Sequence, residues 1–185
     1  MNTPNKLTLL RIMLIPLFIV LLFAYFIPQN YLLALVVFAV ASLTDLLDGY
    51  LARKNNLITD FGKLMDPLAD KLLVISAIVC FIELRLTPSV IVVIILAREL
   101  MVTSMRLVAA GKGSVLAADK WGKYKTVSQM VWIIAVLLMC WLEQLGFNKI
   151  PFSLINYSLT AIATLLTVVS GVNYLWQNRE IFKNN

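Results

Sequence analysis

The sequence predicts an all-α integral membrane protein with six transmembrane helices and both termini on the cytoplasmic side. Three observations support this fold class. Of the 185 residues, 61% are hydrophobic and 14% are charged, whereas a soluble domain carries about 25% charged residues. Long apolar runs recur along the chain, each close to the roughly 20 residues that cross the hydrocarbon core of a bilayer. The basic residues are also distributed unevenly between alternate connections.

The apolar runs follow one another with short connections, at residues 7–27, 31–52, 64–82, 89–110, 124–145 and 152–176. Pro28, Pro88 and Pro151 separate successive runs on one side of the membrane, and Gly111 begins a longer connection on the other. No polar linker divides the chain, so residues 1–185 are expected to form one transmembrane domain.

The Lys and Arg residues indicate which connections are cytoplasmic. They gather at both ends of the chain and at the connections after the second and fourth runs, while the opposite side has only Arg85 and Lys149. An excess of Lys and Arg marks the cytoplasmic side, which places both termini there. The net charge of +6 is therefore attributed to membrane orientation, and no nucleic-acid partner is expected.

Four aspartates lie at regular spacing around the second connection. Asp45 and Asp48 are three residues apart, and Asp66 and Asp70 are four apart, so each pair shares one face of a helix. At about 1.5 Å per residue, Asp45 lies roughly 21 Å from the outer end of its run, and the second pair lies about 5 to 10 Å into the next. Two antiparallel helices thus bring four carboxylates to one level near the inner headgroups.

Four carboxylates at one level need a compensating charge. Two like charges about 4 Å apart cost on the order of 4 kcal/mol at an effective dielectric of about 20. The chain has no His, and Cys80 and Cys140 lie alone in apolar runs, so oxygen-binding Mg²⁺, Mn²⁺ or Ca²⁺ is favoured over zinc. Four carboxylates suffice for two bridged ions, an arrangement suited to displacement at phosphorus. Solvated helix ends are the alternative explanation, which we prefer only for Asp60.

The residues from Asp45 to Asp70 read D-x-x-D-G-x-x-A-R, eight residues, then G-x-x-x-D-x-x-x-D. This pattern resembles the signature of the CDP-alcohol phosphatidyltransferase family without a departure, and the resemblance extends over nearly the whole chain. It implies six transmembrane helices with a cytoplasmic active site. It also implies transfer of a phosphatidyl or similar group from a CDP-linked donor to an alcohol, with release of CMP.

The same resemblance assigns roles to individual residues. Two divalent cations, Mg²⁺ or Mn²⁺, would be held by Asp45, Asp48, Asp66 and Asp70. Asp70 would also accept the proton of the attacking hydroxyl. The CDP part of the donor would contact Gly49, Arg53, Thr59 and Gly62. Near the N-terminus, Asn5 and Thr8 are helix caps on residue type alone, and the resemblance adds a contact with the donor. Arg11 is expected to snorkel toward the headgroups.

Charged residues also occur inside the fourth run, at Arg98, Glu99 and Arg106. A charge at mid-membrane costs about 2.5 to 3.5 kcal/mol or more, so such side chains usually face a polar interior. Internal ion pairing is one explanation. The other is a basic pocket for an acceptor that carries a phosphate, formed by Arg98, Arg106, Lys120, Lys123 and Lys125.

The stretch from Arg98 to Arg106, the stretch Gly122-Lys123-Tyr-Lys125-Thr126 and the opening Pro-Asn-Lys-Leu-Thr-Leu-Leu-Arg are similar to the bacterial phosphatidylglycerophosphate synthase subfamily. That resemblance implies CDP-diacylglycerol and sn-glycerol 3-phosphate as substrates. It also implies a homodimer in contact with membrane lipid, in the cell membrane of a bacterium. Three alternatives stay open: another acceptor such as inositol phosphate, serine or phosphatidylglycerol; a divalent-cation transporter; and a non-catalytic scaffold.

Overall fold

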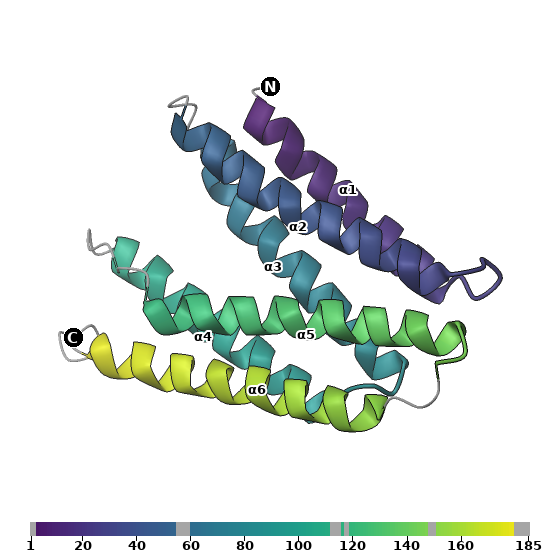
Figure 1. Ribbon diagram of the computed structural model, residues 1–185. Coiled ribbons are helices and arrows are strands. Elements are labelled where there is room, and N and C mark those ends of the chain that lie inside the picture. Colours follow the sequence, from purple (N-terminus) through teal and green to yellow (C-terminus); the bar gives the residue numbers. More distant parts are fainter. Residues whose placement is uncertain (1–2, 55–59, 112–115, 117–118, 148–150, 180–185) are drawn as a thin grey trace. The chain divides into compact units, whose positions relative to one another are not determined.

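The structure is a computed structural model that describes residues 3–54, 60–111, 116, 119–147 and 151–179. Side chains are described within these ranges except at 3–5, 45–54, 60–64, 66 and 67. The described residues form six helices and no strand: α1 (Thr3–Phe23), α2 (Asn30–Lys54), α3 (Asp60–Glu83), α4 (Ser89–Gly111), α5 (Lys120–Gln144) and α6 (Phe152–Gln177) (Figure 1).

Each helix occupies one of the apolar runs predicted from the sequence, which confirms the all-α class. By length and composition three described segments could cross a membrane: Lys6–Phe23, Lys120–Gln144 and Phe152–Gln177. Asn30–Thr44 is a shorter apolar stretch of α2. The chain is therefore a helical membrane protein.

Tight turns end α3 and α5. Arg85 adopts a left-handed conformation (φ 57°), and the Leu86 N–H donates to the Phe81 carbonyl at 2.9 Å. This pattern is a Schellman motif, which satisfies the last carbonyls of the helix and reverses the chain. Gly146 (φ 86°) occupies the same position after α5, where glycine avoids the steric cost of a left-handed residue.

The described contacts divide the chain into two compact units. Unit 1 comprises Met1–Cys80 and Ile133–Pro151, and unit 2 comprises Phe81–Trp132 and Phe152–Asn185. The helices α3 and α5 contribute to both.

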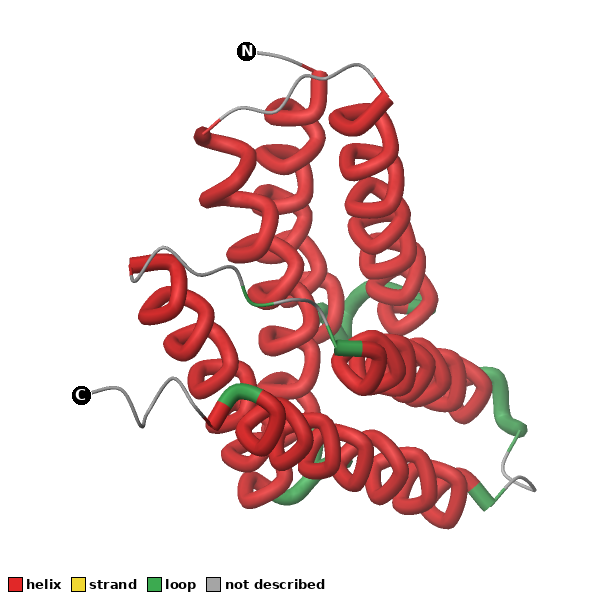
Figure 2. The backbone as a smooth tube through the Cα atoms, turned by 90° about the vertical axis from the view of Figure 1, so that its left-hand side faces the viewer, coloured by secondary structure: helices red, strands yellow, loops and turns green. Residues whose placement is uncertain are grey.

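In unit 1, α1 packs along α2. The rings of Phe18 and Phe38 meet at a centroid distance of 5.8 Å, and the Asn30 amide donates to the Leu22 carbonyl at 2.9 Å. The start of α1, the end of α2 and the start of α3 lie at one end of this unit (Figures 1 and 2). The two halves of the aspartate motif therefore lie at the same end, separated by a short connection.

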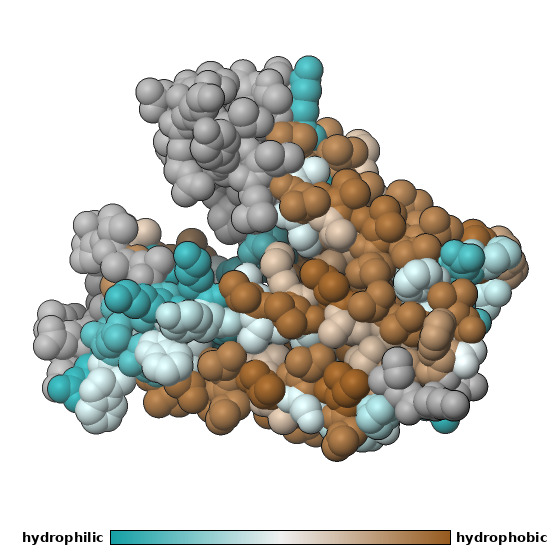
Figure 3. All heavy atoms as spheres, in the orientation of Figure 1, coloured by the Kyte–Doolittle hydropathy of each residue, from teal (hydrophilic) through white to brown (hydrophobic). Residues whose placement is uncertain are grey.

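Unit 2 has a polar interior and an apolar exterior. Along α6 the buried positions recur every three or four residues, at Phe152, Asn156, Thr160, Ala163, Thr167, Ser170, Gly171 and Tyr174. The exposed positions of the same helix are large and apolar, for example Leu165 at 64% and Val172 at 60%. Figure 3 shows the apolar surface that results. Polar side chains that turn inward from an apolar surface are typical of helices surrounded by lipid.

Candidate active site

The aspartate motif lies on two helices of unit 1. Asp45 and Asp48 belong to α2, and Asp66 and Asp70 belong to α3. Because both pairs lie in regular helix, the spacings of three and four residues put each pair on one helix face. The connection of 55–59 keeps the ends of these helices close, since five residues span less than about 20 Å when fully extended.

Most of the predicted donor and metal ligands have side chains outside the described set. This applies to Asn5, Asp45, Asp48, Arg53 and Asp66. For Gly49 and Gly62 only the helical backbone is described, and Thr59 lies outside the described residues altogether. Asp70 is described and half-buried. Among the described side chains, no group of three or more His, Cys, Asp or Glu could hold a metal ion. The metal site thus stays a prediction, although an all-carboxylate donor set fits a hard divalent cation.

Thr8 and Arg11 are fully buried on the inner face of α1. They continue the stripe of buried residues formed by Ile15, Phe18 and Leu22, which follows the 3.6-residue period of the helix. The expectation that Arg11 snorkels toward the headgroups is therefore wrong. The buried arginine adds a cation to the interior of unit 1.

A compact ionic cluster occupies the interior of unit 2. Glu99 Oε1 accepts from Lys125 Nζ at 2.5 Å and from Arg98 Nη1 at 3.0 Å. Arg98 Nη2 donates to Ser170 Oγ at 2.5 Å. Side chains from α4, α5 and α6 thus meet at one point, and the three charged side chains are only 6% to 11% exposed. Charge-assisted bonds of this kind fix geometry more firmly than neutral ones.

Two glycines make room for the Arg98 side chain. A Cβ at Gly171 would lie 3.1 Å from Arg98 Cγ, and one at Gly122 would lie 3.5 Å from Arg98 Nη2. Gly171 belongs to α6 and Gly122 to α5, so both neighbouring helices approach the arginine closely. The guanidinium is consequently held by packing as well as by hydrogen bonds.

The other predicted cations lie at the same end of unit 2 but are exposed. These are Arg106, Lys120 and Lys123. Arg106 Nε donates to the Tyr174 hydroxyl at 3.2 Å, and its guanidinium carbon lies 5.6 Å from the centroid of that ring. The buried Tyr174 therefore serves as a platform for Arg106. Hydrophilic residues gather around the start of α5 and the end of α6 (Figure 3).

Of the five predicted acceptor-binding cations, the structure thus brings two together in the ionic cluster, Arg98 and Lys125. Sequence reasoning missed Ser170, Gly171 and Tyr174, which contact Arg98 or Arg106 from α6. Their spacing could have indicated that they are buried, because they lie on the same face of α6 as the polar residues Asn156, Thr160 and Thr167.

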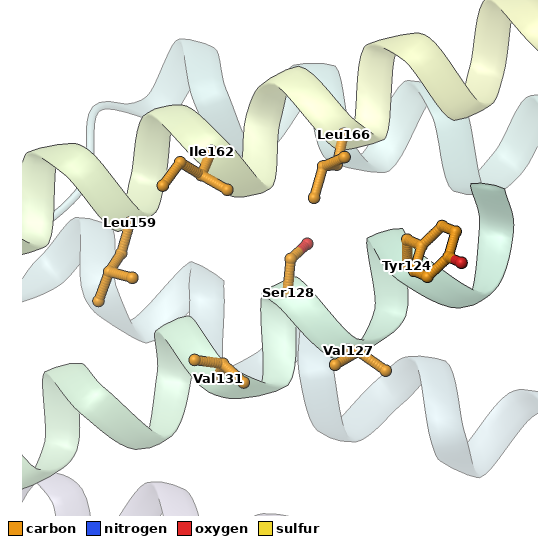
Figure 4. Close-up of a pocket in the computed structure, with 7 residues that line it drawn as sticks. All are labelled: Tyr124, Val127, Ser128, Val131, Leu159, Ile162 and Leu166. Atoms are coloured by element: carbon orange, nitrogen blue, oxygen red, sulfur yellow. The ribbon is translucent and has the colours of Figure 1, made fainter.

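An apolar groove of about 370 Å³ separates α5 from α6. It is lined by Tyr124, Val127, Ser128, Val131, Leu159, Ile162 and Leu166 (Figure 4). The Ser128 hydroxyl already donates to the Lys125 carbonyl at 2.7 Å. The groove therefore offers apolar surface to a lipid chain and contains none of the predicted site residues.

The profile of the CDP-alcohol phosphatidyltransferase family matches residues 1–172. Three bacterial proteins named CDP-diacylglycerol–glycerol-3-phosphate 3-phosphatidyltransferase are similar to the chain. That of Bacillus subtilis (strain 168) is 43% identical over 195 residues, covering 100% of this chain and 98% of that protein. Those of Rickettsia bellii and Haemophilus influenzae are 36% and 34% identical, covering 98% and 94% of this chain and 97% and 91% of the relatives. With the aspartate motif at one end of a helical membrane unit, these matches show that the chain belongs to the CDP-alcohol phosphatidyltransferase family.

Proposed function

We propose that the chain transfers the phosphatidyl group of CDP-diacylglycerol to sn-glycerol 3-phosphate, giving phosphatidylglycerophosphate and CMP. The observation that carries this proposal is the complete aspartate motif from Asp45 to Asp70, on two helices that meet at one end of unit 1. The names of the relatives, which match the chain along its whole length, support the donor and the acceptor. The reaction belongs to the synthesis of anionic phospholipids.

The donor would bind at the motif. Members of the family generally depend on divalent metal ions, and Asp45, Asp48, Asp66 and Asp70 would hold two of them, Mg²⁺ or Mn²⁺. When bound, such ions neutralise charge that develops on the phosphates and on the leaving CMP. Gly49 and Gly62 would allow the nucleotide to approach the backbone. The remaining donor contacts would come from Asn5, Thr8, Arg53 and Thr59.

Asp70 would act as the base for the attacking hydroxyl. It is the one carboxylate of the motif whose side chain is described, and it is half-buried in α3. A carboxylate within hydrogen-bonding reach of the acceptor hydroxyl can accept its proton as the bond to phosphorus forms. The proton of the acceptor hydroxyl would pass to Asp70. The P–O bond between the phosphatidyl group and CMP would break, and its electron pair would leave with CMP.

The phosphate of the acceptor would bind at the cationic end of unit 2. The described part of this end carries Arg98, Arg106, Lys120, Lys123 and Lys125, with Arg98 and Lys125 fixed by the ionic cluster. The Nε of Arg106 donates a hydrogen bond to the Tyr174 hydroxyl. The two Nη groups of the same guanidinium are suited to bidentate contact with phosphate. This binding orients the hydroxyl for attack.

The membrane arrangement is also part of the proposal. All six helices would span the membrane, with both termini and the active site on the cytoplasmic side, because Lys and Arg gather there. The protein would be a multi-pass protein of a bacterial cell membrane and would form a homodimer, as the family resemblance implies. Residues 1–185 would act as one catalytic domain.

The test is CMP release by the purified protein with Mg²⁺ or Mn²⁺, CDP-diacylglycerol and glycerol 3-phosphate. Release should require the acceptor and fall at least about a hundredfold in Asp66→Asn, as expected when a group acting on the reacting phosphate is lost. Asp60→Asn is the matched control, since it removes a nearby aspartate outside the motif and should retain activity. Release only with serine, inositol phosphate or phosphatidylglycerol would change the acceptor. Metal flux into liposomes without CMP release would refute the reaction.

A further inference from the structure

Glu99 lies at the centre of the ionic cluster in unit 2. A single oxygen, Oε1, accepts from Lys125 Nζ at 2.5 Å and from Arg98 Nη1 at 3.0 Å. Neighbouring residues on a helix do not face each other, so the Arg98 guanidinium must turn back along α4 to reach Glu99. The carboxylate thereby fixes the positions of two cations that come from different helices.

Among the described residues, the cluster contains two cations, Arg98 and Lys125, and one carboxylate, Glu99. Asp119, the other described carboxylate at this end of unit 2, accepts a hydrogen bond from the Asn173 amide at 2.7 Å. Cations held in fixed positions are suited to binding an anionic group such as a phosphate.

A second observation also indicates a ligand. Arg98 Nε is a buried donor with no hydrogen-bond partner among the described residues, although its two Nη groups are bonded to Glu99 and Ser170. Buried donors are normally satisfied, and an unsatisfied one in a native structure calls for an explanation. An anion bound beside the guanidinium would satisfy this donor.

We propose that Glu99 is a positioning residue for the acceptor phosphate: it does not touch the acceptor but holds Arg98 and Lys125 where both can bind it. This inference rests on the proposed function, in which that phosphate binds at this end of unit 2. The unsatisfied Nε of Arg98 is then a donor available to the phosphate. Gly122 and Gly171 keep the arginine in place from the other two helices.

The experiment is a double-mutant cycle of Glu99→Gln and Lys125→Gln, read as the KM for glycerol 3-phosphate, the KM for CDP-diacylglycerol and kcat. Gln retains the shape of each side chain better than Ala and removes its charge. Glu99→Gln should raise the KM for glycerol 3-phosphate by about tenfold, which corresponds to about 1.4 kcal/mol, and leave the KM for the donor unchanged. Because Glu99 acts through Lys125 as well as through Arg98, Glu99→Gln should raise the acceptor KM less in the Lys125→Gln background than in the wild-type enzyme.

Two further variants separate positioning from folding. Glu99→Asp keeps the charge on a shorter side chain and should restore part of the affinity, so it also serves if Glu99→Gln does not fold. Glu83→Gln removes an exposed carboxylate at the end of α3 and should change none of the constants. The inference is overturned if the two KM values rise together, if the effects of Glu99 and Lys125 are additive, or if only the unfolding temperature changes. If the wild-type enzyme uses another phosphorylated acceptor, the proposed function fails, and the same cycle with that acceptor still tests Glu99.

Discussion

Gly171 provides a quantitative test of how tightly unit 2 is packed. A Cβ at this position would lie 3.1 Å from Arg98 Cγ, whereas carbon atoms in contact prefer about 3.5 to 4.0 Å. Gly171→Ala therefore requires a shift of about half an ångström. The arginine cannot yield freely, because its far end is bonded to Glu99 and Ser170.

The sign of the effect follows from two opposing contributions. Replacing Gly by Ala inside a helix stabilises it by about 1 kcal/mol. Extra volume in a well-packed interior costs about 1 to 3 kcal/mol, and displacing a hydrogen bond to a charged group costs about 1.5 to 3 kcal/mol. We expect a net loss of about 1.5 to 5 kcal/mol, which lowers the unfolding temperature by about 2 to 4 °C per kcal/mol for a chain of this size.

Two other glycines provide matched controls for the same substitution. A Cβ at Gly122 would make an ordinary contact of 3.5 Å with Arg98 Nη2, and one at Gly111 would meet nothing within 4 Å. The unfolding temperature in detergent should therefore fall in the order Gly111→Ala, Gly122→Ala, Gly171→Ala. The acceptor KM should rise only in the variants that displace Arg98. The reasoning is refuted if Gly171→Ala stabilises the protein as much as Gly111→Ala does and leaves that KM unchanged.

Three further predictions address other parts of the molecule. Tyr174→Phe removes the hydroxyl that accepts the Arg106 hydrogen bond but keeps the ring. It should raise the KM for glycerol 3-phosphate about fivefold, the equivalent of about 1 kcal/mol. Unchanged steady-state constants would contradict the platform role. Arg85→Gly should stabilise the protein by about 0.5 to 1 kcal/mol in thermal unfolding and Gly146→Ala should destabilise it by about 1 to 2 kcal/mol, because both positions are left-handed. Chelation with EDTA should abolish CMP release, and Mg²⁺ or Mn²⁺ should restore it; turnover that persists in EDTA would contradict a metal-dependent site.

The sequence was sufficient to predict the helices because apolar length is a strong signal in a membrane protein. Each predicted run overlaps one helix, and four of the five connections contain Pro or Gly; residues 55–59 contain neither. The starts of helices were less accurate: α3 begins at Asp60 rather than at 64. That first turn is polar, and polar residues at a helix end carry no hydropathy signal.

The inward faces of the helices were harder to predict. In a soluble protein the apolar face of a helix identifies its buried side, but here apolar residues occupy both sides. Lys125 was grouped with Lys120 and Lys123 as one basic patch, yet Lys125 is buried and the other two are exposed. Lys125 is four residues from Gln129 and seven from Trp132, both buried on the same face of α5.

The useful signal was the spacing of polar residues within an apolar run. Lys125 and Gln129 are four residues apart on α5, Thr167 and Ser170 are three apart on α6, and all four are buried. The Gln129 amide donates to the Thr167 hydroxyl at 3.1 Å. Arg11 follows the same rule, because it lies three residues after Thr8 and both are buried. What spacing could not give is the identity of the partners, since the ion pair of Glu99 with Lys125 depends on how three helices pack.

The polar interior also links stability to substrate binding. In a bilayer, lipid offers helices a surface as apolar as their own, so apolar contacts alone do not decide which helix packs against which. In unit 2 that choice depends on hydrogen bonds, such as the one from Trp132 Nε1 to Asn156 Oδ1 at 3.1 Å, and on the close approach of Gly171 to Arg98. Arg98 thus joins the helices and also belongs to the proposed acceptor site. Its substitution should weaken folding and acceptor binding together, whereas exposed cations such as Lys123 should affect binding alone.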